Sequence, residues 1–452
     1  MESLDTTILN TAVPAIAHAL GVPPLNMKAV LASYTLSLAV FIPISGWMAN
    51  RFGTRRVFAS AIGTFTLGSL LCGISSDIHW LVICRILQGC GGAMMLPVGR
   101  ITMVRTFPKS ELVRAMSFVS IPSLVAPMLG PLLGGAIIRY FHWSVIFFVN
   151  IPIGLLGLIM VYLHLPNYRE QRRRPLDLIG LILFGSGISL FSYVLEVFGE
   201  TTLSGREMLG LLIMSAALLA GYGMNTRRTR YPLLRLRLLR IRSLRLSVAG
   251  NLLTRLGIGG IPFLLPLLYQ VGLGFTPIQS GLLIMPQALA AMSLKMAMPL
   301  ILQKMGYRTV LIGNTLLMGV MIMLFATVGL ATPVWLIVLQ AFTYGFLTSM
   351  QYTSMNTLAY ADVGEHETAD ASTIASTVQQ LAVSFGVAAA SLTAALFIPG
   401  HVHASPAQML HGIHLALLAL AVLTVGSTAV FWNLKSSDGS SVSRHNVQIP
   451  AA

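Results

Sequence analysis

Four ionisable side chains of this 452-residue sequence stand out inside apolar stretches, where a charge is costly. They are Asp5, Arg85, Arg255 and Lys295. Asp5 is the acid best suited to bind and release a proton, because burial favours the neutral carboxyl whereas a nearby cation favours the carboxylate. Three cations against one acid also indicate a cavity that could accept an anion. The alternative is that Arg85 and Lys295 extend along the helix surface to the lipid headgroups.

The composition around these side chains is that of a membrane protein. Apolar residues make up 55% of the chain and charged residues only 10%, whereas a soluble chain carries roughly 25% charged residues. Apolar windows of about 20 residues recur, each long enough to cross a hydrocarbon core of about 30 Å as a helix. We therefore predict an all-α polytopic membrane protein with fourteen transmembrane helices. The predicted spans are 4–20, 28–48, 57–75, 79–104, 116–138, 143–165, 176–196, 207–223, 246–272, 278–301, 309–329, 332–352, 374–398 and 409–433.

The formal net charge of +15 has two interpretations. Nucleic-acid binding would need a fold that does not fit between the spans, so we expect no nucleic acid as a partner. The other interpretation is the positive-inside rule, because the basic loop residues lie almost entirely after even-numbered spans. The exceptions are Lys28, Arg139 and Arg206. This pattern predicts that both termini are cytoplasmic.

A short basic loop between spans two and three, residues 46–56, is duplicated later in the chain. Its sequence from Arg51 to Val57 (RFGTRRV) returns from Lys304 to Val310 (KMGYRTV), after span ten. Two six-span repeats separated by two inserted spans would produce this placement, and internal repeats are typical of secondary transporters. The predicted domains are an N-terminal lobe (1–166), two inserted spans with a linker (167–230) and a C-terminal lobe with a short cytoplasmic tail (231–452). The candidate residues of the first loop copy are Gly46, Asn50, Arg51, Gly53, Arg55 and Arg56.

Small residues and prolines mark spans four and five. Span four combines a cation and an amide with a flat face for a neighbouring helix, through Arg85, Gln88, Gly89 and Gly91. In span five, glycines at i and i+4 let backbones approach closely, and prolines remove amide donors and permit a bend. This span is either a pliant seam between two halves or a close packing surface. Its residues are Pro127, Gly130, Pro131, Gly134 and Gly135.

The basic segment 227–245 alternates leucine and arginine. It is either an in-plane helix on the inner leaflet, with its arginines on anionic lipid, or a plain cytoplasmic connector. Asp177 follows the basic run 169–174 and suits an N-cap for the seventh span.

The sequence gives little support for a metal site or for enzymatic activity. The outer loop before the last span contains His401, His403, His411 and His414, which could bind a divalent metal. A solvated loop is the preferred interpretation, so we predict no metal site. The three cysteines lie in apolar helices without a metal-ligand spacing and are expected to be packing residues. No nucleophile–base pair or phosphate loop is present, which argues against an enzyme.

Several segments in register resemble fourteen-span drug:proton antiporters of the major facilitator superfamily. The run 4–14 (LDTTILNTAVP) is similar to their first-span signature. The loop 46–56 resembles their motif after span two, and 85–93 their span-four motif. Residues 126–135 resemble the antiporter motif of span five, and 143–154 the sixth span.

This resemblance implies a two-lobed bundle that exports drugs or other small molecules by alternating access, against proton entry across the bacterial inner membrane. Asp5 would then couple protons and Arg85 would be its electrostatic partner, while Gly130, Pro131, Gly134 and Gly135 would form the antiporter seam. The implied partners are membrane lipid, protons and a small-molecule substrate. The energy source would be the proton gradient, without any cofactor, and a monomer is compatible with this mechanism.

Two departures from the family pattern affect these expectations. The loop motif has Asn50 where the family has an acidic residue, which weakens a charge-paired latch. Asp5 lies almost at the first residue, whereas the family's first span begins well before its aspartate. Either the start of the chain lies upstream of Met1 or the first helix is incomplete, and we favour the former.

Two other functions stay open on the sequence alone. Arg85, Arg255 and Lys295 suit an exporter of organic anions, such as carboxylates or their metal chelates. The acidic loop 361–370 and the basic segment 227–245 suit a non-transporting accessory or sensor partner of a neighbouring efflux system.

Overall fold

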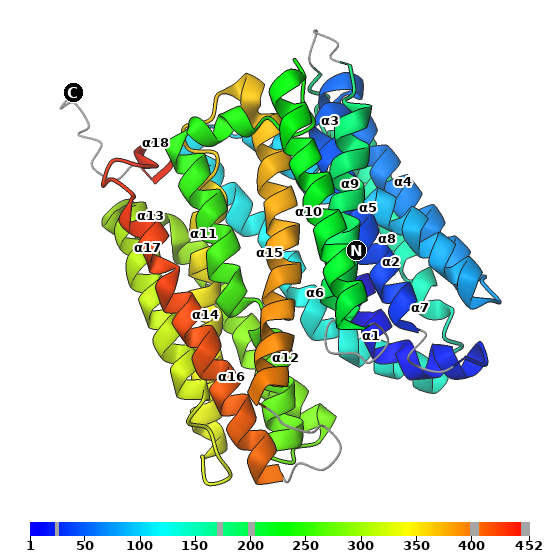
Figure 1. Cartoon of the computed structure of the whole chain (residues 1–452), viewed down its shortest axis with the longest axis vertical. Helices are drawn as coiled ribbons and strands as arrows, with labels where there is room; N and C mark the ends of the chain where they lie inside the picture. Colours follow the sequence, from blue (N-terminus) through cyan, green and yellow to red (C-terminus); the bar gives the residue numbers. More distant parts are fainter. Residues whose placement is uncertain (23–26, 170–174, 198–203, 398–405, 444–452) are drawn as a thin grey trace.

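The computed structural model of the chain is a bundle of long helices (Figure 1). It describes residues 1–22, 27–169, 175–197, 204–397 and 406–443. Every regular element in these ranges is helical.

In the first half of the chain, α5 packs against α2 and α4, while α1 packs on α6 and α8 on α4. The elements are α1 (Glu2–Ala19), α2 (Met27–Phe41), η2 (Ile42–Ile44), α3 (Ser45–Phe52), α4 (Thr54–Gly73), α5 (Ile78–Thr106), η3 (Lys109–Glu111), α6 (Leu112–Tyr140), α7 (Val145–Phe148) and α8 (Asn150–His164). α2, η2 and α3 follow one another without a break and act as one long helix.

Between the halves, α9 (Leu178–Val197) and α10 (Gly205–Arg228) form an antiparallel pair that rests on α2 through α9. Asp177 caps α9 as predicted, because its Oδ1 accepts a hydrogen bond from the Gly180 amide at 2.8 Å. The same carboxylate accepts from the Asn225 side chain near the end of α10. Asp177 therefore ties the start of one inserted helix to the end of the other.

In the second half, α13 packs most closely on α14, and α11 packs on α15 and α16. The elements are η4 (Leu236–Arg240), α11 (Arg242–Ile258), α12 (Ile261–Leu267), η5 (Leu268–Gly272), α13 (Pro277–Phe325), α14 (Val334–Leu358), η6 (Glu365–Glu367), α15 (Thr368–Phe397), α16 (Pro406–Gly426), α17 (Thr428–Trp432) and α18 (Ser440–Ser443). α13 consists of two helices joined by a kink at Gly306.

The predicted class, an all-α polytopic membrane protein, is confirmed. In the described ranges, nine helical stretches are long and apolar enough to cross a membrane. They are Ala29–Phe52, Thr54–Gly73, Ile78–Thr106, Val145–His164, Gly205–Arg228, Arg242–Gln270, Ala297–Phe325, Val334–Leu358 and Gln408–Trp432. Helices also cover the other predicted windows, but the total of fourteen spans and the domain boundaries remain predictions.

The two copies of the loop motif share one backbone feature. Gly53, between α3 and α4, has φ +95°, and Gly306, at the kink of α13, has φ +71°. Both values lie in the left-handed region that favours glycine. At Gly53 an added Cβ would also overlap the side chain of Asn167. The matching glycines therefore make the same kind of helix-to-helix turn, which supports an internal duplication.

The two halves meet closely at the end of the bundle that carries α3, η3, η4 and α18, which we name the basic end (Figure 1). A Cβ at Gly46 would overlap the Thr373 hydroxyl at the start of α15. Ser372 donates to the Pro97 carbonyl at 3.0 Å. The Ala361 carbonyl accepts both Lys109 Nζ from the first half, at 2.7 Å, and a hydroxyl of the C-terminal α18, at 2.9 Å. The halves are therefore closed against each other at the basic end.

Candidate functional site

A buried ion pair joins α1 to α5. Arg85 Nη1 lies 2.6 Å from Asp5 Oδ2, and the two side chains are 1% and 0% exposed. Removing two charges from water is costly, so such a pair needs further hydrogen bonds to be stable. The neighbouring side chains supply them.

The carboxylate of Asp5 accepts two neutral amides besides the guanidinium. Gln88 Nε2 and Asn150 Nδ2 donate to its Oδ1 at 3.0 and 2.9 Å. Gln88 lies one turn after Arg85 and accepts from the same Nη1 at 2.7 Å. Asn150 begins α8 and is held in turn by Ser69 of α4, whose hydroxyl lies 3.0 Å away. Side chains of α5 and α8 therefore bind the carboxylate directly, and Ser69 of α4 supports one of them.

The guanidinium of Arg85 also lies over an aromatic ring. Its Cζ is 4.3 Å from the ring centroid of Tyr34 on α2, a distance at which a cation is attracted to the ring face. Arg85 Nε and the Tyr34 hydroxyl are buried and have no hydrogen-bond partner among the described residues. Unsatisfied buried polar atoms are costly, and here they leave hydrogen-bonding capacity beside the ion pair.

Glycines of α5 explain how its neighbours come so close to Arg85. A Cβ at Gly89 would lie 2.5 Å from Ser37 Cβ on α2. At Gly91 it would lie 2.5 Å from the backbone amide of Phe65 on α4. Larger residues would push these helices away, so each glycine permits close packing against a different neighbouring helix.

The structure thus brings Asp5, Arg85 and Gln88 together, and their role remains a prediction. Sequence reasoning did not assign Asn150 to this site. The signal was present, because Asn150 lies in the 143–154 segment that carries the resemblance to the sixth span, inside an otherwise apolar stretch. A buried asparagine in such a stretch requires a polar partner.

Arg100 is a second residue that sequence reasoning missed. It is buried in α5, and its guanidinium crosses to α15, with Nη2 2.6 Å from Gln379 Oε1 and Nη1 3.4 Å from the Ser376 hydroxyl. Its position inside the predicted span 79–104 is the signal that could have found it. Arg100 is therefore a polar link between the two halves.

The cations of the second half are arranged differently. Arg255 Nε donates to Asn251 Oδ1 at 2.7 Å, and its Cζ lies 4.0 Å from the ring centroid of Tyr352. Lys295 Nζ donates to the Thr353 hydroxyl at 2.5 Å. Both cations are buried and contact consecutive residues of α14, and neither forms a salt bridge with an acid in the described part of the chain. Arg85 does not belong to this group, because Asp5 neutralises it.

In the first loop motif, the uncharged Asn50 side chain forms a hydrogen bond where the family's acidic residue would form an ion pair. Its Oδ1 accepts from Arg105 Nη2 on α5 at 3.2 Å. The Arg51 carbonyl accepts Arg169 Nε at 3.1 Å. Arg55 and Arg56 lie in the first turn of α4.

The predicted antiporter seam forms a contact between α6 and α1. A Cβ at Gly130 would overlap the Thr7 hydroxyl, two residues from Asp5. Gly134 is buried, whereas Gly135 is exposed and a Cβ there would meet open space. The side chains of Pro127 and Pro131 are outside those that the structure describes. Close packing is therefore established at Gly130 alone, and the seam's pliancy remains a prediction.

The histidine candidates do not form a described metal site. His401 and His403 lie outside the described residues. His414 Nε2 is 2.8 Å from the Val328 carbonyl, and His411 is exposed. Within the described ranges, no three His, Cys, Asp or Glu side chains are grouped as a metal would require.

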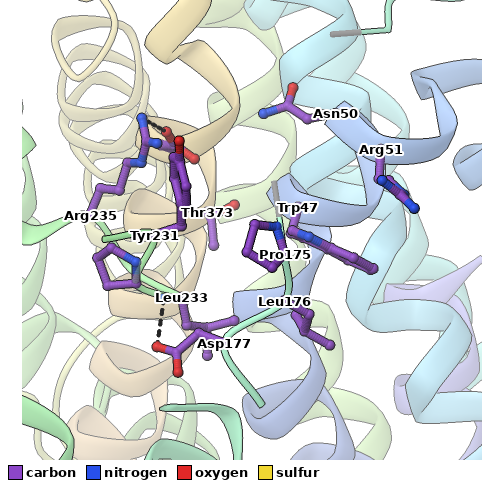
Figure 2. Close-up of a pocket in the computed structure, with 12 residues that line it drawn as sticks. Trp47, Asn50, Arg51, Pro175, Leu176, Asp177, Tyr231, Leu233, Arg235 and Thr373 are labelled. Atoms are coloured by element: carbon purple, nitrogen blue, oxygen red, sulfur yellow. Dashed lines mark hydrogen bonds and ion pairs between the residues drawn. The ribbon is translucent and has the colours of Figure 1, made fainter. Parts of the chain in front are cut away.

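A small cavity at the basic end lies where the connector between α10 and α11, residues 229–241, meets both halves (Figure 2). Its volume of about 30 Å³ suits one water molecule. Arg235 Nη1 lies 3.0 Å from Asp370 Oδ2 of α15, and the Leu233 amide donates to Asp177 Oδ2 at 3.2 Å. The cavity is therefore a polar junction and is too small to hold a drug-sized molecule.

Residues 1–387 match the family model of the major facilitator superfamily. The chain belongs to this family. Its relatives include proteins named multidrug resistance protein MdtD. The one from Serratia proteamaculans is 39% identical over 392 residues, covering 87% of this chain and 82% of its own length. One from Escherichia coli O7:K1 is 40% identical over 402 residues, covering 89% and 85%.

Two solved major facilitator structures share the fold at low sequence identity. The human organic anion transporter MFSD10 has a TM-score of 0.66 and 13% identity, covering 95% of this chain and 96% of its own. The proton:xylose symporter XylE has a TM-score of 0.65 and 16% identity, covering 98% and 94%. The matched proteins are transporters and not enzymes, so the protein is a major facilitator transporter with multidrug resistance relatives.

Proposed function

We propose that this transporter exports drugs or other small molecules across the bacterial inner membrane in exchange for protons. The observation that carries the proposal is the Asp5 carboxylate, which is buried at a helix junction and held by one cation and two amides. It is the acid with a cation partner inside the described membrane-spanning helices. A proton on Asp5 would cancel its attraction to Arg85 and weaken the link between α1 and α5.

The packing around Asp5 offers a route from that proton to a change of shape. Thr7, on the same helix, packs against Gly130 of α6, and α6 packs against α13 in the other half. A small shift of α1 would therefore reach the contact between the halves. Tightly packed interfaces of this kind tend to exchange between discrete arrangements rather than deform continuously.

We infer that the basic end faces the cytoplasm, because basic residues favour cytoplasmic loops. The contacts of Gly46, Ser372 and Lys109 then close the cytoplasmic side in this conformation. Alternating access requires these contacts to open in the opposite state. We expect both termini to be cytoplasmic and the protein to work as a monomer surrounded by lipid.

The test is proton movement in proteoliposomes. Adding ethidium, a cationic drug probe, should release protons from parent vesicles in step with ethidium movement. Asp5→Asn should abolish both signals. The matched control is Asn150→Asp with Asp5→Asn, which returns a carboxylate to the same hydrogen-bond network from another helix. Proton-coupled ethidium transport that persists in Asp5→Asn would overturn the proposal.

A second candidate is an exporter of organic anions, favoured by the two buried cations of the second half. Arg255 and Lys295 contact only neutral partners in the described residues, so a carboxylate substrate or its metal chelate could supply the missing charge. Flux of citrate, used as the probe, should then fall in Arg255→Gln while surviving in Asp5→Asn. A third possibility, a non-transporting accessory role, requires no flux of any probe in parent vesicles.

A further inference from the structure

The basic end of α10 carries an open groove that the transport site does not use. The groove has a volume of about 500 Å³ and lies between the last turns of α10 and the connector that includes η4. We name it the α10–η4 groove. It is lined by Ala220, Gly223, Met224, Thr226, Arg227, Leu236 and Arg237.

The connector that forms one wall is held firmly in place. The Leu234 amide donates to the Tyr222 hydroxyl of α10 at 3.0 Å, and the Leu233 amide donates to Asp177. Leu238 of η4 is buried in a hydrophobic core cluster that includes residues of both halves. These hydrogen bonds and this burial are made by the protein's own residues, so they hold the connector wall of the groove in place.

The groove faces the periphery of the bundle. In α10, only 11% of the residues in the most apolar 18-residue window are buried, against 28–61% in the other membrane-spanning stretches of the described chain. Met224 and Leu236, at the groove, are 62% and 42% exposed. Because α10 is long and apolar enough to cross the membrane, this surface must contact lipid.

The charged wall of the groove contains two arginines. Arg227 and Arg237 are exposed, and neither forms a salt bridge with an acid in the described ranges. Two cations therefore lie beside an apolar floor at the depth where a helix leaves the hydrocarbon. Phosphate is the anion that a lipid presents at that depth, and basic pockets on the cytoplasmic side commonly bind anionic headgroups.

We propose that the α10–η4 groove binds an anionic phospholipid of the inner leaflet. Arg227 and Arg237 bind the phosphate, and an acyl chain lies along Met224 and Leu236. The assignment to the inner leaflet rests on the cytoplasmic orientation inferred above. The lipid would attach the inserted helix α10 to the connector, which reaches α15 through the ion pair of Arg235 and Asp370.

The experiment measures thermal stability and lipid retention of the full chain in nanodiscs of phosphatidylcholine, with and without phosphatidylglycerol. Phosphatidylglycerol should raise the unfolding temperature of the parent and remain bound on transfer to detergent. Arg227→Gln with Arg237→Gln should lose this response and weaken binding at least about tenfold. The matched control, Arg206→Gln with Arg228→Gln, removes two exposed arginines of α10 that do not line the groove and should respond like the parent.

Ala220→Trp keeps both arginines but fills the groove floor, so it should also lose the response. Equal stabilisation of the parent and both groove variants would overturn the proposal. The proposal would also be overturned if soluble glycerol phosphate stabilised the parent as much as phosphatidylglycerol does, since the groove would then bind phosphate without lipid. The readouts do not depend on transport, so a failure of the proposed antiport leaves them interpretable.

Discussion

Asp5 and Arg85 in the first half form a closed charge pair with amide partners, whereas Arg255 and Lys295 in the second half are buried cations with neutral partners. The two arrangements have different energetics. A buried pair is costly to break because the remaining charge loses its partner. A buried cation that already contacts only neutral groups has no counter-charge in the described chain to lose.

This difference suggests a division of labour between the halves. Under the proposed function, the first half would hold the group that a proton neutralises, and the second half would hold charge that a substrate could neutralise. Helices α9 and α10 contribute to neither site in the described residues, and α10 is the least buried of the membrane-spanning stretches found there. Substitutions on the two sides should therefore have unequal effects.

The largest effect is expected from Arg85→Gln. It leaves Asp5 charged and buried with only amide donors, so we expect a stability loss of about 3–5 kcal/mol. Thermal unfolding in detergent measures it. Adding Asp5→Asn should recover part of the loss, because the unpaired charge disappears. A single variant as stable as the parent would show that the ion pair does not hold α1 to α5.

An intermediate effect is expected from Asn150→Ala. It removes one donor from Asp5 and a partner from Ser69, and leaving buried polar groups unsatisfied costs about 1–3 kcal/mol. Proton-coupled transport should persist at reduced rate, since Arg85 and Gln88 still hold the carboxylate. The control is Asn225→Ala, which removes a donor from Asp177 outside this network. It should lower stability without affecting proton coupling. Complete loss of coupling in Asn150→Ala would contradict this prediction and show that proton coupling itself requires the Asn150 amide.

The smallest effect on stability is expected from Lys295→Met. Methionine has a similar length and needs no solvation, and the variant leaves no acid unpaired in the described chain. We expect a change within about 1 kcal/mol, of either sign. Thermal unfolding checks this, with Thr353→Val as the control for the lost hydrogen bond. A loss as large as that of Arg85→Gln would reveal a counter-charge for Lys295 and remove the contrast between the halves.

Much of the architecture follows from the sequence alone. Apolar windows predict helices because only helices satisfy their backbone hydrogen bonds within hydrocarbon. The return of the Arg51–Val57 sequence at Lys304–Val310 predicted an internal repeat, and in each copy the structure has a left-handed glycine between two helices. Asp5 and Arg85 were identified as functional candidates because a charge in a span is costly wherever its partner lies.

Only the tertiary structure decided which of these charges meet. Arg85, Arg255 and Lys295 are equivalent in the sequence, as single cations in apolar windows. Arg85 pairs with an acid 80 residues away, whereas the other two pair with no acid in the described residues. The partnership depends on which faces of α1, α5 and α8 turn inward, and a hydropathy pattern does not contain those rotations. For the same reason Asn150 and Arg100 were missed, because their significance comes from side chains on other helices.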